Sequence, residues 1–371
     1  MQKALFRHSD IQDPYSYYTA RLRESPLLWD KDSGAWVIYG YASCKQLLQD
    51  SRAEIPGLPP AALEPLNEVA LRLVRNLVRL KNAPSHVTAR EITSALFTNR
   101  VQVSIPDSME KLLPPGRGPF AFDWMVTVAN KLPVLILAES LGFSPADSGR
   151  ILDGIGDLVR ILSPFRTDEQ VMALNRAAEE IYLLTERHLA DRGIFDSPES
   201  YVSNLVGLFI QSYDAGRGLL GNSLVQCLQQ GDLSQLRAGN KDYISRCVRE
   251  TLRYDPPVHH TRRVLISAIE LEDITLQKGE LIVLMLAAGN RDDQQFAQPE
   301  IFDPFRENLQ DILTFGSGAH ECMAHHFSVH MATEALHYLF QAYKNIELVE
   351  KPGYEPLMNV RVPRQLLVGL S

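Results

Sequence analysis

The chain of 371 residues is 45% hydrophobic and 22% charged, which are the proportions of an ordinary globular protein. Its net charge of −8 argues against a general nucleic-acid-binding function. No apolar run approaches the ~18 residues that a transmembrane helix needs, and the N-terminal segment has no apolar signal core. The cysteines are widely spaced without a CxxC pair, which indicates a reducing compartment and no zinc site or disulfide framework. We therefore expect a cytoplasmic protein that binds neither membranes nor nucleic acids.

Helical patterns dominate residues 66–255, and runs typical of strands are short. Residues 202–228 are apolar around most of the helix circumference, which predicts a buried helix. Stretches rich in proline and glycine predict loops at residues 56–65 and 112–120. The expected strands cover residues 36–39, 268–276, 281–286 and 361–370. These patterns predict one mostly α domain over residues 1–371, with small peripheral β-sheets.

Two charged residues lie one helical turn apart in the run SRCVRETLRYDPPV. Glu250 and Arg253, at positions i and i+3, share a helix face and can form an ion pair. Pro256 and Pro257 end that helix. Such a pair is most often exposed to solvent and then contributes little to stability. The ExxR spacing is therefore a weak signal when it stands alone.

The most informative segment is TFGSGAHECMA, residues 314–324. Gly316 and Gly318 permit a tight loop in which backbone N–H groups can approach a sulfur atom. Apolar residues recur at helical spacing over residues 323–340, so Cys322 is expected where a helix begins. The helix dipole and the free N–H groups there favour a thiolate. Although a lone cysteine is usually a small buried hydrophobe, a buried thiolate beside an aromatic ring and N–H donors is a suitable axial ligand for haem iron.

These motifs occur in an order that resembles the cytochrome P450 family. The order is ExxR, NRD at 290–292, PEIFDPFR at 299–306 and FGSGAHEC at 315–322, and the resemblance extends over nearly the whole chain. It implies a cytochrome P450 fold, shortened relative to typical members, with haem b as the cofactor and Cys322 as the iron ligand. Arg306 would complete a buried network with Glu250 and Arg253 that supports folding and haem retention. The resemblance implies further haem contacts by Phe315, next to the ligand, and, toward the propionates, by His86, Arg90, Arg263 and His320.

The same resemblance identifies the helix that crosses the distal face of the haem. Asp214 keeps the acid of the family pattern, whereas Ala215 stands where a threonine is usual. Alanine has no side-chain hydrogen bond to offer for proton delivery. Gly216 and Gly218 each weaken a helix by roughly 1 kcal/mol relative to alanine, which predicts a distorted turn that admits water. The alternative for Asp214 is a residue that simply faces solvent near a helix irregularity.

Three kinds of chemistry remain open for such a site. A water molecule or a substrate hydroxyl could replace the threonine in ordinary monooxygenation. The enzyme could instead perform coupling, cyclisation or desaturation, or it could use peroxide or a redox-neutral haem reaction. We expect the first, a hydroxylation or epoxidation of a small metabolite or natural-product intermediate, with Asp214 relaying protons. A different class is a haem-binding sensor or binding partner without oxygenase activity.

The resemblance also predicts substrate contacts and protein partners. The pocket candidates are Phe209, Ser212 and Tyr213 on the distal helix, and His259 and His260 after the Pro-Pro turn. At least one of the two histidines is expected to contact the substrate, and the alternative is that one of them faces solvent or a propionate. Electrons would come from a ferredoxin and a ferredoxin reductase, because no flavin or iron–sulfur segment is fused to the chain. We expect the enzyme to be a monomer.

Overall fold

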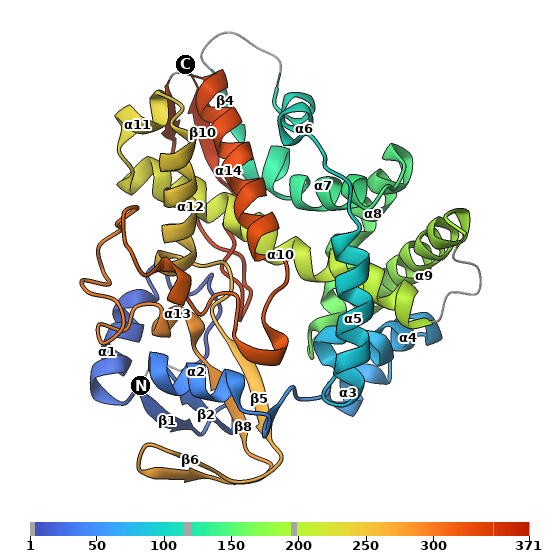
Figure 1. The fold of residues 1–371 in the computed structure, drawn as a ribbon, viewed down its shortest axis with the longest axis vertical. Coiled ribbons are helices and arrows are strands. Elements are labelled where there is room, and N and C mark those ends of the chain that lie inside the picture. Colours follow the sequence, from blue (N-terminus) through green and yellow to red (C-terminus); the bar gives the residue numbers. More distant parts are fainter. Residues whose placement is uncertain (1–3, 115–119, 194–198, 344, 371) are drawn as a thin grey trace. The chain divides into compact units, whose positions relative to one another are not determined.

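The computed structural model describes residues 4–114, 120–193, 199–343 and 345–370 (Figure 1). Contacts within the chain divide it into two compact units, each built from separated stretches of sequence. Unit 1 comprises residues 1–54, 105–129 and 215–371, and unit 2 comprises residues 55–104 and 130–214. Neither unit is a contiguous piece of the chain, so the prediction of a single domain stays a prediction. Within the described ranges, none of the helices is long and apolar enough to cross a bilayer.

The largest sheet belongs to unit 1 and has five strands. In spatial order these are β1 (Leu27–Asp30), β2 (Ala35–Ile38), β8 (Leu281–Leu284), β5 (Thr261–Leu265) and β3 (Ala53–Glu54). The β2–β8 pair is parallel and the other pairs are antiparallel. A buried cluster that includes Val37, Val283 and Tyr18 covers one part of it, as expected for strands whose alternate side chains face a core. The predicted strands at 36–39 and 281–286 are thus present with small shifts in their ends.

Two smaller sheets complete the β-structure of unit 1. One joins β4 (Phe120–Asp123), β10 (Leu367–Leu370) and β9 (Ile346–Leu348), and the other is the hairpin of β6 (Ile269–Leu271) and β7 (Ile274–Leu276). The single strand expected at 268–276 is therefore wrong, because the chain reverses at Glu272, which adopts a positive φ of 51°. The strand expected at 361–370 is confined to its last four residues, since Pro363 cannot donate to a ladder.

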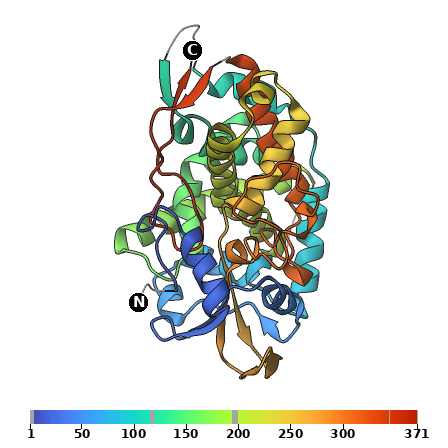
Figure 2. The same cartoon turned by 90° about the vertical axis from the view of Figure 1, so that its left-hand side faces the viewer.

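The helices of unit 1 hold most of the predicted motifs. They are α1 (Tyr15–Glu24), α2 (Tyr41–Gln49), α6 (Ile105–Leu112), α11 (Leu233–Arg237), α12 (Lys241–Tyr254), α13 (Leu286–Gly289) and α14 (His325–Ala342), with short turns η2 (Met125–Ala129), η4 (Leu309–Asp311) and η5 (Gly318–His320). Helices α12 and α14 run side by side (Figures 1 and 2). Lys241 at the start of α12 pairs with Glu334 near the middle of α14, and Arg249, further along α12, acts electrostatically on His325 at the start of α14. The two helices are therefore antiparallel.

Unit 2 is helical. Its helices are α3 (Pro60–Leu63), α4 (Glu68–Asn76), α5 (Ser85–Thr98), α7 (Leu132–Ser140), α8 (Pro145–Leu158) and α9 (Asp168–Asp191), with turns η1 (Val78–Leu80) and η3 (Val159–Leu162). Thr167 and Gln170 form a capping box at the start of α9, which satisfies otherwise free N–H groups. The stretch 56–65, predicted as a loop, contains the short helix α3, whose Pro60 sits at a first-turn position where proline is tolerated. The other predicted loop, 112–120, lies partly outside the described residues.

Helix α10 (Glu199–Gln230) passes from unit 2 into unit 1 after residue 214 and is continuous over 32 residues. It matches the buried helix predicted over residues 202–228. Its side chains are buried on both sides of a half-buried stretch at residues 211–215. That stretch contains Asp214 and Ala215.

Candidate active site

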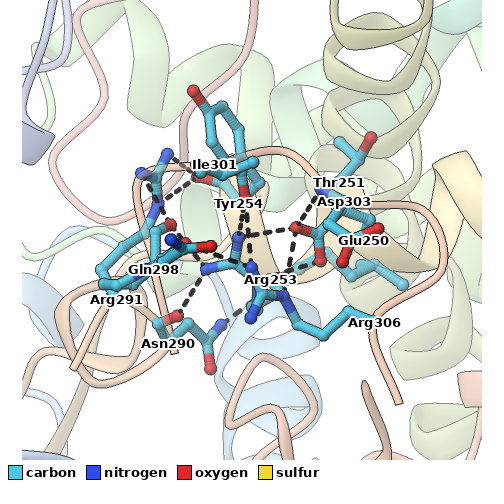
Figure 3. Close-up of polar contacts among 12 residues, drawn as sticks. Glu250, Thr251, Arg253, Tyr254, Asn290, Arg291, Gln298, Ile301, Asp303 and Arg306 are labelled. Carbon is cyan, nitrogen blue, oxygen red and sulfur yellow. Dashed lines mark hydrogen bonds and ion pairs between the residues drawn. The ribbon is translucent and has the colours of Figure 1, made fainter. Parts of the chain in front are cut away.

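A buried arginine cluster, centred on Arg253, lies at the C-terminal end of α12 (Figure 3). Arg253 Nε donates to Glu250 Oε2 at 2.9 Å and Nη2 donates to Oε1 at 2.6 Å. Nη1 donates to the carbonyls of Asn290 and Pro299, and Nη2 also donates to that of Ile301. Each of the five guanidinium N–H groups therefore has an acceptor. Both side chains of the ion pair are 0% exposed, so it differs from the exposed pair that the spacing alone suggests.

Arg306 lies beside the same glutamate. Its Nε is 3.5 Å from Glu250 Oε1, an ion pair without hydrogen-bond geometry. Its Nη1 donates to the carbonyl of Ala297 at 2.7 Å, and Nη2 donates to that of Ile301 at 3.2 Å. The three residues predicted for the structural network are therefore brought together by α12 and the loop at 299–306.

Asn290 connects the arginine cluster to the cysteine loop. Its carbonyl accepts from Arg253, and its side-chain oxygen accepts from the backbone N–H of Leu313 at 2.7 Å. Its Nδ2 donates to Thr314 Oγ1 at 2.7 Å, and that hydroxyl donates to the carbonyl of Leu252. One buried amide thus fixes the chain just before Phe315. The NRD motif marked this position, but the spacing gave no indication of its partners.

The loop of residues 315–324 presents Cys322 at its end. Gly316 and Gly318 both have φ of 73°, a conformation that favours glycine. A side chain at Gly318 would meet the carbonyl oxygen of Leu48 at 2.9 Å. The N–H of Cys322 donates to the carbonyl of Phe315 at 2.8 Å. The loop is therefore held by backbone contacts on both sides.

The thiol of Cys322 is exposed, whereas those of Cys44, Cys227 and Cys247 are buried. The sequence led us to expect a buried sulfur at Cys322, and the structure of the protein chain shows an exposed one. Helix α14 begins at His325, two residues after the expected start of the helical pattern. Phe315 stacks on the ring of His325, with centroids 4.0 Å apart. Burial, then the neighbouring His326 and Arg249, lowers the pKa of His325.

The residues predicted to bind propionates lie in both units. In unit 1, His320 ends the turn η5 and Arg263 lies in β5. Arg263 is buried, and its Nη1 donates to the carbonyl of Arg262 at 2.8 Å. In unit 2, His86 and Arg90 lie one turn apart on α5. Burial, then the charge of Arg90, lowers the pKa of His86, which is consistent with one shared helix face.

The predicted distortion of the distal helix is wrong. Helix α10 is regular through Gly216 and Gly218. A side chain at Gly218 would meet Pro257 Cβ at 2.8 Å and the carbonyl oxygen of Arg361 at 3.1 Å. Close packing of the helix on these segments explains that glycine better than a water-admitting turn does. Packing thus overrides the low intrinsic helix propensity of glycine.

The pocket candidates on α10 have different surroundings. Phe209 is fully buried in unit 2 and packs edge-to-face on Phe143, with centroids 5.6 Å apart. Ser212 is half-buried and donates to the carbonyl of Phe209 at 3.0 Å. The hydroxyl of half-buried Tyr213 lies beside Gly156 of α8. Phe209 therefore has the position of a core residue, whereas Ser212 and Tyr213 keep accessible surface.

His259 and His260 belong to a buried histidine cluster of unit 1, with His8 as its third member. His259 is 0% exposed and its Nδ1 is hydrogen-bonded to Tyr18 at 2.9 Å. His260 is hydrogen-bonded through Nε2 to the carbonyl of Met358 at 3.1 Å. The His8 and His259 rings meet edge-on at 4.2 Å. Neither predicted pocket histidine therefore offers surface to a substrate, and the N-terminal partners that bury them were not predicted.

The residues of unit 1 fit a haem thiolate. Among the four cysteines, Cys322 alone is exposed, and it is carried on a loop whose preceding residues are fixed by the arginine cluster. A thiolate with backbone support is a ligand suited to haem iron. His320 and Arg263 supply basic groups for carboxylates in the same unit. No group of three or more histidine, cysteine or acidic residues in the described ranges forms another metal site.

Comparisons with known proteins agree with this assignment. A family model described as Cytochrome P450 matches residues 225–366. The chain is 26% identical to the biotin biosynthesis cytochrome P450 of Bacillus subtilis (strain 168), with 96% of each chain covered. It is 28% identical to cytochrome P450 119 of Sulfurisphaera tokodaii, over 94% of this chain and 100% of that protein. The structure of P450BioI in complex with an acyl carrier protein ligated to hexadec-9Z-enoic acid aligns with a TM-score of 0.86 at 24% identity, covering 97% of this chain and 99% of that one.

The mostly helical fold and the cysteine loop define a haem-thiolate oxidoreductase. The chain belongs to the cytochrome P450 family and is a monooxygenase of that family, with a haem-thiolate cofactor. The predicted fold, enzyme class and cofactor are confirmed, so the alternative of a sensor without oxygenase activity is set aside. The roles of individual site residues and the electron donor stay predictions.

Proposed function

We propose that the enzyme hydroxylates or epoxidises a small, mainly apolar organic molecule, with Cys322 as the iron ligand. The supporting observation is the exposed thiol on a loop that Asn290 ties to the buried arginine cluster. When bound, the haem supplies oxygen activation at a thiolate-ligated iron. The chain itself would hold the thiolate, would bind the haem carboxylates in unit 1 through Arg263 and His320, and would deliver protons.

The substrate class is proposed from the ligands of proteins with a similar fold. A fatty acyl group bound to a carrier protein is present with P450BioI. Corticosterone and testosterone are present with CYP109E1 from Bacillus megaterium. These ligands are extended or polycyclic and largely apolar, which favours a fatty acid or steroid-like substrate over a small polar metabolite. Half-buried Ser212 and Tyr213 would supply polar contacts to orient it.

Proton delivery is proposed to start at Asp214 and to pass through a water molecule or a substrate hydroxyl. Both Asp214 and Ala215 lie in the half-buried stretch of α10, and alanine offers no side-chain donor. The same alanine favours a second candidate, in which the substrate is coupled, cyclised or desaturated without gaining oxygen. Ala215→Thr should raise the yield of oxygenated product per electron under the first proposal. An unchanged yield would contradict this account of proton delivery.

The first experiment is the absorption spectrum of the reduced, carbon-monoxide-bound protein. A red-shifted Soret band is expected for Cys322 ligation, and Cys322→Ser should abolish it together with activity. A band of the histidine-ligated type in the wild type would overturn the ligand assignment. Reaction under isotopically labelled dioxygen, with a ferredoxin and its reductase as the proposed electron donors, then separates the two candidates. Label in the product supports oxygen insertion, and an unlabelled product supports coupling or desaturation.

A further inference from the structure

A polar groove lies between α12 and α14 and has no part in the site described above. It encloses about 250 Å³. Lys241, Ser245 and Arg249 follow one another at four-residue intervals, so they share one face of α12. The groove is lined from α12 by Lys241, Asp242, Ser245 and Arg249, and from α14 by His326, Val329, His330 and Thr333. Seven of these eight side chains can form hydrogen bonds, which is unusual for the seam between two packed helices.

Thr333 is the buried polar group of this groove. It is 4% exposed, and its hydroxyl has no hydrogen-bond partner among the described residues. The buried helical threonines Thr93, Thr185 and Thr251 each donate to the carbonyl four residues earlier at 2.7–2.8 Å. Thr333 makes no such hydrogen bond to a carbonyl of its own helix. Because an unpaired buried hydroxyl costs free energy, its place in the wall of a cavity points to a partner that occupies the cavity.

The charges of the groove favour an anion. Lys241 is paired with Glu334, and Asp242 accepts from Arg246 at 2.9 Å. Arg249 is exposed and makes no ion pair within the described part of the chain, so its charge is available to a ligand. The neutral ring of His326 offers one N–H donor. His330 Nδ1 lies 3.6 Å from Glu334 Oε1, so its Nε2 is the nitrogen that can turn to a ligand. The groove therefore has more hydrogen-bond donors that lack an acceptor than acceptors that lack a donor.

We propose that this groove binds a small dianionic oxyanion, either inorganic phosphate or a phosphate monoester. Arg249 supplies the charge, and Thr333, Ser245 and the two histidines supply further hydrogen bonds. At ~30 Å³ for each water molecule, the cavity has room for a phosphate group and a small attached group. The bound ion joins α12, which ends in the arginine cluster, to α14, which follows Cys322.

Calorimetric titration of the holoenzyme with inorganic phosphate at constant ionic strength tests the proposal. Arg249→Gln should weaken binding at least about tenfold, because it removes a charge-assisted hydrogen bond. Arg75→Gln is the control, since it removes the same charge from an exposed guanidinium that is paired with Glu68 and does not line the groove. The control should bind within about twofold of the wild type. A parallel titration with glycerol 3-phosphate shows whether an attached organic group adds affinity.

Thr333→Val separates binding from folding. This change removes a hydroxyl that has no partner, so the thermal unfolding temperature without phosphate should not fall. Phosphate binding should weaken several-fold. The proposal is overturned if the wild type shows no binding up to about 10 mM. It is also overturned if Arg249→Gln and Thr333→Val both bind like the wild type, because the ion would then lie elsewhere, such as the substrate pocket.

Discussion

The two buried polar clusters of unit 1 solve the same physical problem in opposite ways. In the arginine cluster, every N–H of Arg253 has an acceptor and a carboxylate balances the charge. In the histidine cluster, His8 has no partner at either ring nitrogen and His260 has none at Nδ1, among the described residues. The side chains of the arginine cluster stay charged because their hydrogen-bond donors and acceptors match. The histidines stay neutral because some of their ring nitrogens have no partner.

The pKa values express this difference. Burial, then the charges of Arg361 and His260, lowers the pKa of His8 to about 3. Burial, then the charge of Arg262, lowers the pKa of His260 to about 4. Burial also holds the pKa of His259 well below its usual value. The histidine cluster is therefore neutral near pH 7, whereas guanidinium groups remain charged at any working pH. We expect mutation to damage the first cluster most and acid to damage the second.

The largest effect is expected from Glu250→Gln. The substitution keeps the shape of the side chain but leaves Arg253 and Arg306 without their counter-charge in a buried site. Breaking a buried ion pair in this way costs about 3–5 kcal/mol. Urea unfolding of the holoenzyme would measure it. The control is Glu68→Gln, which breaks an exposed pair with Arg75 and should cost under about 0.5 kcal/mol. Equal losses would mean that burial does not set the strength of the arginine cluster.

The second largest loss of stability is expected from Asn290→Ala. It removes the acceptor of the Leu313 N–H and the donor to Thr314, which leaves buried groups unpaired at a cost of roughly 2–3 kcal/mol. Because those residues precede the cysteine loop, the variant should also lose haem faster when apomyoglobin is added as an acceptor. Thr314→Val, which keeps the Leu313 contact, should show a smaller change. Haem loss at the wild-type rate would contradict the proposed connection.

The sequence predicted the first cluster better than the second for a physical reason. Glu250 and Arg253 are one helical turn apart, and the motifs that contact them follow in fixed order, so a local pattern marks them. The histidine cluster joins His8, Tyr18 and His259, which come from distant parts of the chain without any periodic pattern. The distorted turn predicted from Gly218 was wrong for a related reason. Glycine is needed there because the helix packs closely against Pro257, and intrinsic helix propensity contains no information about such tertiary contacts.

Acid should weaken the fold through the histidine cluster. Below pH ~6.5 the unfolded chain binds a proton at His8 that the folded protein does not bind until about pH 3. The free energy of unfolding therefore falls as the pH is lowered, by about 2 kcal/mol at pH 5 for this residue. His8→Phe removes the titration without removing a hydrogen bond. Its unfolding free energy, measured between pH 8 and pH 5, should fall less steeply than that of the wild type. Parallel curves would exclude His8 as a source of acid sensitivity.

The smallest effect is expected from Tyr18→Phe, which tests whether hydrogen bonds within the histidine cluster still contribute. His259 would lose its 2.9 Å bond at Nδ1 and keep the longer 3.4 Å contact between Nε2 and Tyr15. A cost of about 1 kcal/mol at pH 8 follows. Tyr17→Phe is the matched control on α1, because its half-buried hydroxyl accepts from Arg21 and can be replaced there by water. If the two variants lose the same stability, the cluster depends on ring packing alone, and its orphaned nitrogens would matter only through their protonation.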